Sequence, residues 1–158
     1  MIRSENIKLL LWGTAVVLIQ IVLLRHLSVL GAEPDLVFLY LLWLCKSRNR
    51  TSVLLFAAYT AFLQDALTDL WGIHLFSKTL TLFILHNYLN RISQTRFYFW
   101  QVAAVVFVST LIFNLIFSGV ALFSDLYASG SFLWIRIVVA SVYTALLGSF
   151  LYLVKVTD

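Results

Sequence analysis

The stretch from residue 62 to residue 80, FLQDALTDLWGIHLFSKTL, holds the side chains with the most chemistry to offer. Two carboxylates (Asp65 and Asp69), an imidazole (His74) and an amine (Lys78) lie within it. The chain as a whole is 62% hydrophobic and only 11% charged. Groups of these types in apolar surroundings hold ion pairs, bind ligands or carry protons. Which of these they do depends on the elements that position them.

The composition is typical of an integral membrane protein. The chain has 158 residues, a mean hydropathy of +0.97 and 16% aromatic residues. A soluble domain of this length needs a polar surface, whereas side chains that face lipid must be apolar. The sequence therefore predicts an all-α fold in a single integral membrane domain over residues 1–158.

Six apolar segments of helical length are predicted to cross the membrane. Their ranges are 7–24, 34–47, 51–70, 73–90, 97–123 and 132–154. Pro34 is expected to start the second helix. Proline lacks the backbone N–H, and an N–H in the first turn has no partner within the helix anyway. That span has the shortest apolar run, and it needs Lys46 and Arg48 to extend their long side chains to the interface. Gly72 is expected to form a tight turn between the third and fourth spans.

The basic residues predict the orientation of these spans. Most of the 11 Lys and Arg residues fall on one side, namely Arg3, Lys8, Lys46, Arg48, Arg50, Arg91, Arg96 and Lys155. The loops of the opposite side contain Arg25. Because cytoplasmic loops carry the excess of Lys and Arg, both termini are predicted to be cytoplasmic. The net charge of +4 thus reports topology, and no basic stripe with interleaved aromatics indicates nucleic-acid binding.

Depth along the spans places three charged residues in one layer of the outer half of the membrane. Asp65 lies about one turn inside the end of the third span, and Lys78 and Arg136 enter the fourth and sixth spans to a similar depth. Asp69 shares a helix face with Asp65. We expect an Asp65–Lys78 ion pair across the Gly72 turn. The layer is open to three interpretations: an internal charge network of Asp65, Asp69, Lys78 and Arg136, a contact with a partner helix, or a ligand or ion pathway.

Small residues precede Asp65 on its face of the third helix. Ala57 and Ala61 lie two turns and one turn before it, and small residues let a neighbouring helix backbone approach closely. Ala57, Ala61 and Asp65 are therefore the predicted face for a partner helix. No three His, Cys or carboxylate residues have the spacing of metal ligands, and no nucleophile or phosphate-loop motif occurs. The sequence predicts a protein without enzymatic activity, metal or cofactor.

Four features of the sequence together resemble the MreD family of bacterial rod-shape-determining membrane proteins. The first span contains Gln20, and the external segment after it ends in Gly31-Ala32-Glu33-Pro34-Asp35. The third span carries Asp65 after Ala57 and Ala61, and Gly72-Ile73-His74 opens the fourth span. The resemblance covers residues 20 to about 89, somewhat under half of the chain.

The resemblance implies a fold similar to the six-helix substrate-binding component of energy-coupling-factor transporters. It implies a non-enzymatic scaffold or regulator of cell elongation and peptidoglycan synthesis in the bacterial inner (cytoplasmic) membrane. The implied partners are MreC and, through it, MreB, RodA and its penicillin-binding transpeptidase. The basic inner loops also favour contact with anionic membrane lipids.

Three other functions remain open, and the minor one is a purely lipid-facing assembly protein with no specific partner. A vitamin-capturing transporter component shares the span count and would need an outward-facing pocket, walled by Asp65, Lys78 and Arg136 with Trp71 or Trp134. An ion-coupled carrier would use Asp65, Lys78 and Arg136 as its pathway, although the sequence contains no internal repeat.

Overall fold

The computed structural model describes residues 4–29, 31–70, 72–92, 98–123 and 132–157. These residues form a short 3-10 helix, η1 (Leu24–Leu27), and six α-helices: α1 (Ser4–Val22), α2 (Leu36–Ser47), α3 (Arg50–Thr68), α4 (Ile73–Ile92), α5 (Phe99–Phe123) and α6 (Phe132–Thr157). The all-helical prediction is confirmed, and each helix lies within a few residues of its predicted range. Arg3, Trp71 and Arg96, which the predictions also used, lie outside the described residues.

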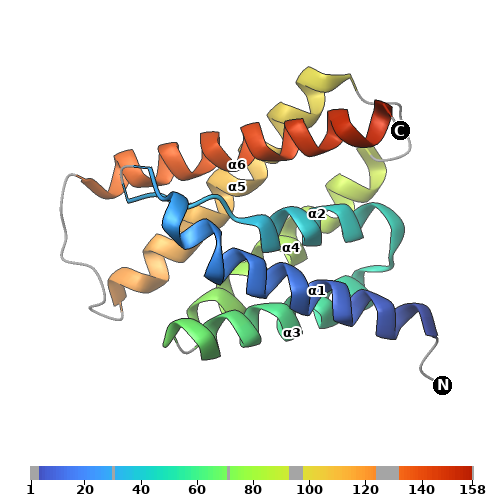
Figure 1. Ribbon diagram of the computed structural model, residues 1–158, viewed down its shortest axis with the longest axis horizontal. Helices are drawn as coiled ribbons and strands as arrows, with labels where there is room; N and C mark the ends of the chain where they lie inside the picture. Colours follow the sequence, from blue (N-terminus) through green and yellow to red (C-terminus); the bar gives the residue numbers. More distant parts are fainter. Residues whose placement is uncertain (1–3, 30, 71, 93–97, 124–131, 158) are drawn as a thin grey trace.

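Successive helices run in opposite directions, and the two termini lie at the same end of the bundle (Figure 1). The turn between α3 and α4 and the connection from α1 to α2 lie at the other end. Among the described residues, three helices are long and apolar enough to cross a membrane, and they cover Ser4–Val22, Phe99–Phe123 and Leu133–Val154. The coarse prediction of a membrane protein is thus supported by these three helices.

The other three helices are shorter or more polar for identifiable reasons. α2 has 12 residues, which is about 18 Å at 1.5 Å per residue, against roughly 30 Å of hydrocarbon. α3 and α4 have polar inner faces, with Thr60, Gln64, Asp65, Ser77, Lys78, Thr81 and His86 all buried. Their outer faces carry exposed apolar side chains such as Phe62 and Phe83. A helix with one polar face has a lower average hydropathy than a helix that is apolar all round.

α2 is the central helix of the bundle. It contacts each of the other five α-helices. Five of its 12 residues, Val37, Phe38, Leu41, Leu44 and Cys45, are fully buried. They pack in one core with residues of α1, α3, α4 and α5. Neighbouring helices cover much of its surface, although Trp43 is 46% exposed, and its sequence is an almost unbroken apolar run.

The start of α2 differs from the prediction that Pro34 is its first residue. The helix begins at Leu36, and Asp35 is its N-cap, with Oδ1 accepting a hydrogen bond from Phe38 N at 2.8 Å. Pro34 precedes the cap, and its carbonyl accepts a hydrogen bond from Gln20 Nε2 at 3.1 Å. Aspartate is among the strongest N-cap residues, so capping by Asp35 sets the boundary.

Close packing of α1 against α3 depends on Gly13. A Cβ atom there would lie 2.9 Å from Thr60 Cγ2 and 3.4 Å from Tyr40 Cε1. We expect Gly13→Val to lower the free energy of unfolding by about 1–3 kcal/mol, because extra atoms force the helices apart. Gly119 is the matched control, since a Cβ there meets nothing within 4 Å, and Gly119→Val should change stability by no more than about 0.5 kcal/mol. Unfolding in detergent measures both, and equal losses would contradict the prediction.

Candidate functional site

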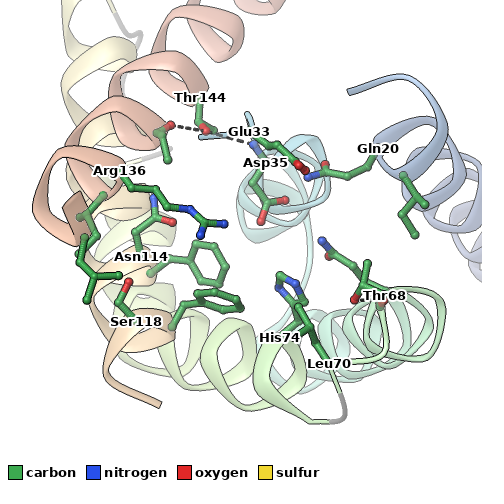
Figure 2. Close-up of a pocket in the computed structure, with 17 residues that line it drawn as sticks. Gln20, Glu33, Asp35, Thr68, Leu70, His74, Asn114, Ser118, Arg136 and Thr144 are labelled. Carbon is green, nitrogen blue, oxygen red and sulfur yellow. Dashed lines mark hydrogen bonds between the residues drawn. The ribbon is translucent and has the colours of Figure 1, made fainter. Parts of the chain in front are cut away.

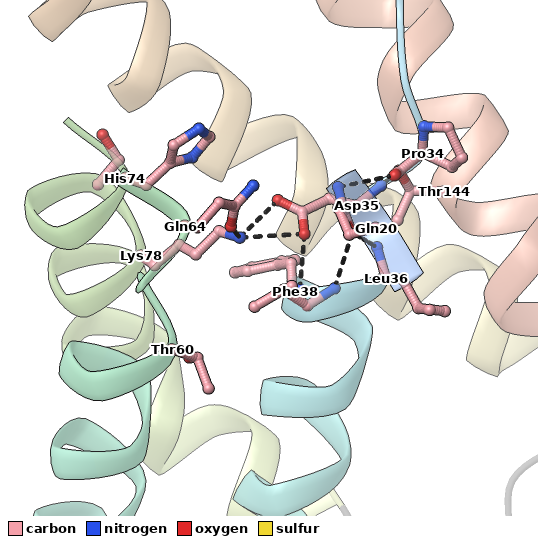
Figure 3. Close-up of polar contacts among 12 residues, drawn as sticks. Gln20, Pro34, Asp35, Leu36, Phe38, Thr60, Gln64, His74, Lys78 and Thr144 are labelled. Atoms are coloured by element: carbon pink, nitrogen blue, oxygen red, sulfur yellow. Dashed lines mark hydrogen bonds and ion pairs between the residues drawn. The ribbon is translucent and has the colours of Figure 1, made fainter. Parts of the chain in front are cut away.

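Polar side chains from other helices meet at the N-terminal end of α2 (Figure 3). Oε1 of Gln20, on α1, accepts hydrogen bonds from Leu36 N at 2.6 Å and Val37 N at 3.1 Å. Oγ1 of Thr144, on α6, accepts one from Asp35 N at 3.1 Å. The first N–H groups of a helix have no partner within the helix, and these side chains supply it. The start of α2 is thereby tied to α1 and α6.

Lys78, on α4, is fully buried and forms an ion pair with Asp35. Its Nζ lies 2.9 Å from Asp35 Oδ2 and 3.0 Å from Oδ1, and it also donates to Gln64 Oε1 at 2.6 Å. The ring of Phe113 lies 5.5 Å away, measured to its centroid. Removing an ammonium group from water costs several kcal/mol unless a counter-charge and hydrogen bonds replace the water. We call Gln20, Asp35, Gln64, Lys78 and Thr144 the cap cluster.

The predicted Asp65–Lys78 pair is wrong. Lys78 pairs with Asp35, while Asp65 caps the start of α4. Its Oδ1 accepts from His74 N and its Oδ2 from Leu75 N, both at 2.9 Å. Similar depth along two helices does not establish that two side chains face each other. The central position of α2 brings Asp35 to Lys78, and that position could not be read from the spans.

The turn between α3 and α4 has the geometry that Asp65 needs. Gly72 has a φ of 87°, in the region that glycine adopts readily and other residues rarely do. Asp69 ends α3 as its C-cap residue, with a φ of 59°. The Asp69 side chain is exposed, whereas Asp65 is only 1% exposed. These two carboxylates therefore lie in different surroundings, although they are one turn apart.

The face predicted to receive a partner helix is covered by the chain itself. Ala57 and Ala61 are 0% exposed, and Asp65 is nearly as buried. α1, α2 and α4 all pack against α3. Small side chains at these positions permit close packing within the bundle, so a partner helix does not reach them in the folded chain. The outward face of α3 carries Leu55 and Phe62 instead.

A partly enclosed cavity of about 260 Å³ lies at the end of the bundle opposite the termini, next to the cap cluster (Figure 2). We call it the outer cup. Its lining comes from both ends of the sequence and from most helices: Gln20, Ile21, Glu33, Asp35, Gln64, Thr68, Leu70, His74, Phe113, Asn114, Phe117, Ser118, Leu133, Arg136, Ile137, Ala140 and Thr144. Every member of the cap cluster except Lys78 lines the outer cup, so the cup and the cluster form one polar region.

Arg136 belongs to the outer cup, and its guanidinium points toward the cavity (Figure 2). Lys78 lies behind the lining, bound to Asp35 and Gln64. Two of the predicted charged residues are thus at or beside one cavity. Trp134, which was considered as a wall of a pocket, is 67% exposed and does not belong to the described lining.

His74 contributes an available polar atom to the outer cup. Its ring packs on that of Phe117, with 4.7 Å between centroids. Its backbone N–H is bound to Asp65, but its buried Nδ1 has no hydrogen-bond partner within the described part of the chain. Buried polar atoms usually have a partner, so this atom marks a place where a bound molecule or water is expected.

Sequence reasoning missed the roles of Asp35, Gln64 and Thr144. Asp35 carries a readable signal, because an aspartate just before an apolar run is a typical N-cap. Gln64 and Thr144 carry only the weak signal of a polar residue in an apolar helix. Asn114, on α5, donates an interhelical hydrogen bond from its Nδ2 to Oγ of Ser141, on α6, at 3.1 Å. Within the described ranges, no group of three or more His, Cys, Asp or Glu residues is placed to hold a metal ion.

Comparison with protein-family models, with curated proteins and with solved structures gives no match for this chain. The resemblance to the MreD family therefore rests on the residues that carry it.

Proposed function

We propose that this chain is a six-span protein of the bacterial inner membrane, related to MreD, that acts as a non-enzymatic scaffold or regulator of cell elongation and peptidoglycan synthesis. α1, α5 and α6 are long enough to span a membrane unaided. α2, α3 and α4 complete the bundle, with their polar groups directed inward. MreC is the proposed direct partner, and MreB, RodA and its transpeptidase are indirect ones.

One observation carries this proposal: the residues of the resemblance form two helix starts at one end of the bundle. Gln20 binds the Pro34 carbonyl and the first N–H groups of α2. Asp65 binds the His74 N–H at the start of α4. Asp65 and His74 are nine positions apart in the sequence, and Gln20 and Pro34 are 14 apart. The residues that carry the resemblance therefore have a definite structural role in this chain, which is what the proposal builds on.

The distribution of charge supports cytoplasmic termini. The end of the bundle that holds both termini also holds the α2–α3 connection, with Lys46, Arg48 and Arg50. Arg48 there pairs with Glu5 at 3.2 Å. The opposite end carries Glu33 and the C-cap residue of α3. Basic residues on one side are the established signature of the cytoplasmic face.

The outward face of α1 is the proposed contact for the single membrane span of MreC. Of the three apolar helices, α1 is the least covered by the rest of the chain. In its apolar stretch of 18 residues 17% of the residues are buried, against 28% in α5 and 39% in α6. Leu11 and Leu18 are exposed on it. Association of helices in lipid depends on close packing of such faces.

We expect a photo-reactive amino acid placed at Leu11 or Leu18 of the full chain, in its native host, to cross-link to MreC. The same probe at Leu146 or Phe150, on the exposed face of α6, is the matched control and should not. Mass spectrometry of the cross-linked products reads the result. Absence of MreC from all four products, together with its absence from gently purified chain, would overturn the scaffold function; equal capture at all four sites would reject α1 as the contact.

The outer cup favours a second candidate function, capture of a small substrate as in a vitamin transporter component. A concave site with a few convergent polar groups is the usual form of a ligand site. An ion-coupled carrier has less support, because Asp65, its key residue, is engaged by two backbone N–H groups.

A further inference from the structure

We propose that the outer cup binds a small, neutral heteroaromatic ring, held by the side-chain amides of Gln64 and Asn114 and stacked on aromatic side chains of the lining. The inference rests on the second candidate function, capture of a small substrate, and deepens it by naming a ligand class. It concerns a cavity, whereas partner binding is assigned to the outer face of α1, so either can fail without the other.

Gln64, on α3, supplies the donor of the site. Its Oε1 accepts a hydrogen bond from Lys78 Nζ at 2.6 Å. An ammonium group can only donate, so the Nε2 group of the amide must lie on the other side, and it points away from Lys78 (Figure 3). Gln64 lines the outer cup and is 4% exposed, and its Nε2 has no hydrogen-bond partner among the described residues. Lys78 thus fixes an amide whose N–H groups are left for a ligand.

Asn114, on α5, supplies the acceptor. Its Nδ2 donates to Ser141 Oγ at 3.1 Å, and Ser141 donates its own proton to the Ile137 carbonyl at 2.8 Å. Because a hydroxyl group has one proton, Ser141 must accept from the asparagine, which fixes the orientation of the amide. Oδ1 of Asn114 has no hydrogen-bond partner in the described part of the chain. The outer cup is therefore lined by a free donor from one helix and a free acceptor from another.

The charged side chains of the described lining do not call for a charged ligand. Asp35 is already met by Lys78 at 2.9 Å. Arg136 already interacts with another residue of the chain. Glu33 is exposed, so water solvates its carboxylate. A charged ligand would lose its hydration in the cup without gaining a counter-charge there, whereas a neutral ligand with donors and acceptors can pair with both amides.

Aromatic rings favour a flat ligand. The ring of Phe117 lies against those of His74 and Phe113, with centroid distances of 4.7 Å and 6.0 Å, and all three residues line the outer cup. Flat heterocycles stack on such rings in an offset arrangement. The buried Nδ1 of His74, which lacks a hydrogen-bond partner among the described residues, adds a polar atom beside them. Stacking and amide pairing together are how proteins bind the rings of nucleobases.

The size of the outer cup limits the ligand to one ring or a fused pair of rings. Its volume of about 260 Å³ lies below the roughly 300–1,000 Å³ of sites for drug-sized molecules. It equals the liquid volume of roughly nine water molecules at about 30 Å³ each. The two amides are held in place before a ligand arrives, so little conformational entropy is lost on binding.

Calorimetric titration of the purified full chain tests the inference with two bases and matched probes. Uracil and adenine are neutral rings with donors and acceptors, and 1,3-dimethyluracil and 6-dimethyladenine lack N–H donors that the parent bases have. We expect at least one base to bind ten or more times as tightly as its methylated counterpart. Orotate, which is uracil with a carboxylate, should bind no more tightly than uracil. Failure of both bases to bind, equal binding of the methylated counterparts, or tighter binding of orotate would overturn the inference.

Variants locate the binding. Gln64→Glu keeps an oxygen for Lys78 but removes the N–H groups, and Asn114→Ala removes the acceptor; each should weaken binding of the preferred base at least tenfold. Gln101→Glu makes the same change at an exposed position near the other end of α5 and should leave binding unchanged. Circular dichroism confirms the fold of each variant, and either cup variant carries the test if the other does not fold. Unchanged binding in a folded cup variant, or an equal loss in the control, would overturn the inference.

Two further measurements separate this result from the proposed functions. Cross-linking to MreC from Leu11 should be unchanged in Asn114→Ala, because the cup and the outer face of α1 are different surfaces. Mass spectrometry of small molecules that copurify with the full chain reports on substrate capture itself. A charged or purely aliphatic molecule recovered there would overturn the ligand class while retaining the second candidate function.

Discussion

Lys78→Met is expected to lower the free energy of unfolding by about 3–5 kcal/mol, because breaking a buried ion pair leaves an uncompensated charge. The stranded charge would be the carboxylate of Asp35, which is 8% exposed. Methionine nearly matches the volume of the lysine stem, so the loss reports the missing charge and hydrogen bonds. Gln64 would also lose the donor that lies 2.6 Å from its Oε1.

A double-mutant cycle isolates the ion pair. Asp35→Asn keeps an oxygen that can accept from Phe38 N, so the cap of α2 is retained while the charge is removed. The double variant Lys78→Met with Asp35→Asn should lose less free energy of unfolding than the two single variants added together. The difference should be about 2 kcal/mol or more. Unfolding in detergent, followed by circular dichroism, measures the four proteins. Additive losses would show that the two residues do not interact.

The exposed pair of Arg48 and Glu5 is the matched control for Lys78. Arg48 Nη2 and Glu5 Oε2 are 3.2 Å apart, but the Arg48 side chain is 28% exposed and the Glu5 side chain 70%. Arg48→Gln should cost no more than about 1 kcal/mol, because water replaces the lost partner. A loss equal to that of Lys78→Met would show that burial is not the cause.

Asp65→Ala is expected to lower the free energy of unfolding by about 2–4 kcal/mol, since two N–H groups would lose a charged acceptor. These are the N–H groups of His74 and Leu75, each 2.9 Å from the carboxylate. A negative charge is also favourable beside the N-terminus of a helix. Asp65→Asn retains one acceptor oxygen and should show an intermediate loss.

Asp69→Asn is the control for Asp65. Asp69 is exposed and has a φ of 59°, a conformation that asparagine tolerates well. Its replacement should leave stability within about 0.5 kcal/mol of the parent. The same detergent unfolding measurement applies. If Asp69→Asn were as harmful as Asp65→Ala, the capping role assigned to Asp65 would not explain the loss.

The helices themselves could be predicted from the sequence, because each is an apolar run of sufficient length between turn or charged residues. The predicted ranges of all six helices differ from the structure by three residues or fewer at each end. The alternation of basic loops predicted that successive helices run in opposite directions, as they do in Figure 1. Gly72 could be placed in a turn because it separates two such runs.

The partners of the buried charges could not be predicted. Lys78 was assigned to Asp65 by depth alone, although depth gives no information on the rotation of a helix about its axis. The short α2 was treated as one span among six, and nothing in its composition says that it contacts all five of the others. The outer cup is formed by the ends of several helices, so it exists only in the assembled bundle.

The short length of α2 has an electrical consequence in the proposed membrane placement. In that placement the outer cup faces the external solution, so the layer of protein across which the transmembrane voltage falls would be thinner there. Moving one charge through the whole potential is worth about 2.3 kcal/mol per 100 mV. Lys78 and Asp35 carry opposite charges 2.9 Å apart, so the field exerts almost no net force on the pair. An ion pair of this kind can stay within a focused field because its two charges cancel.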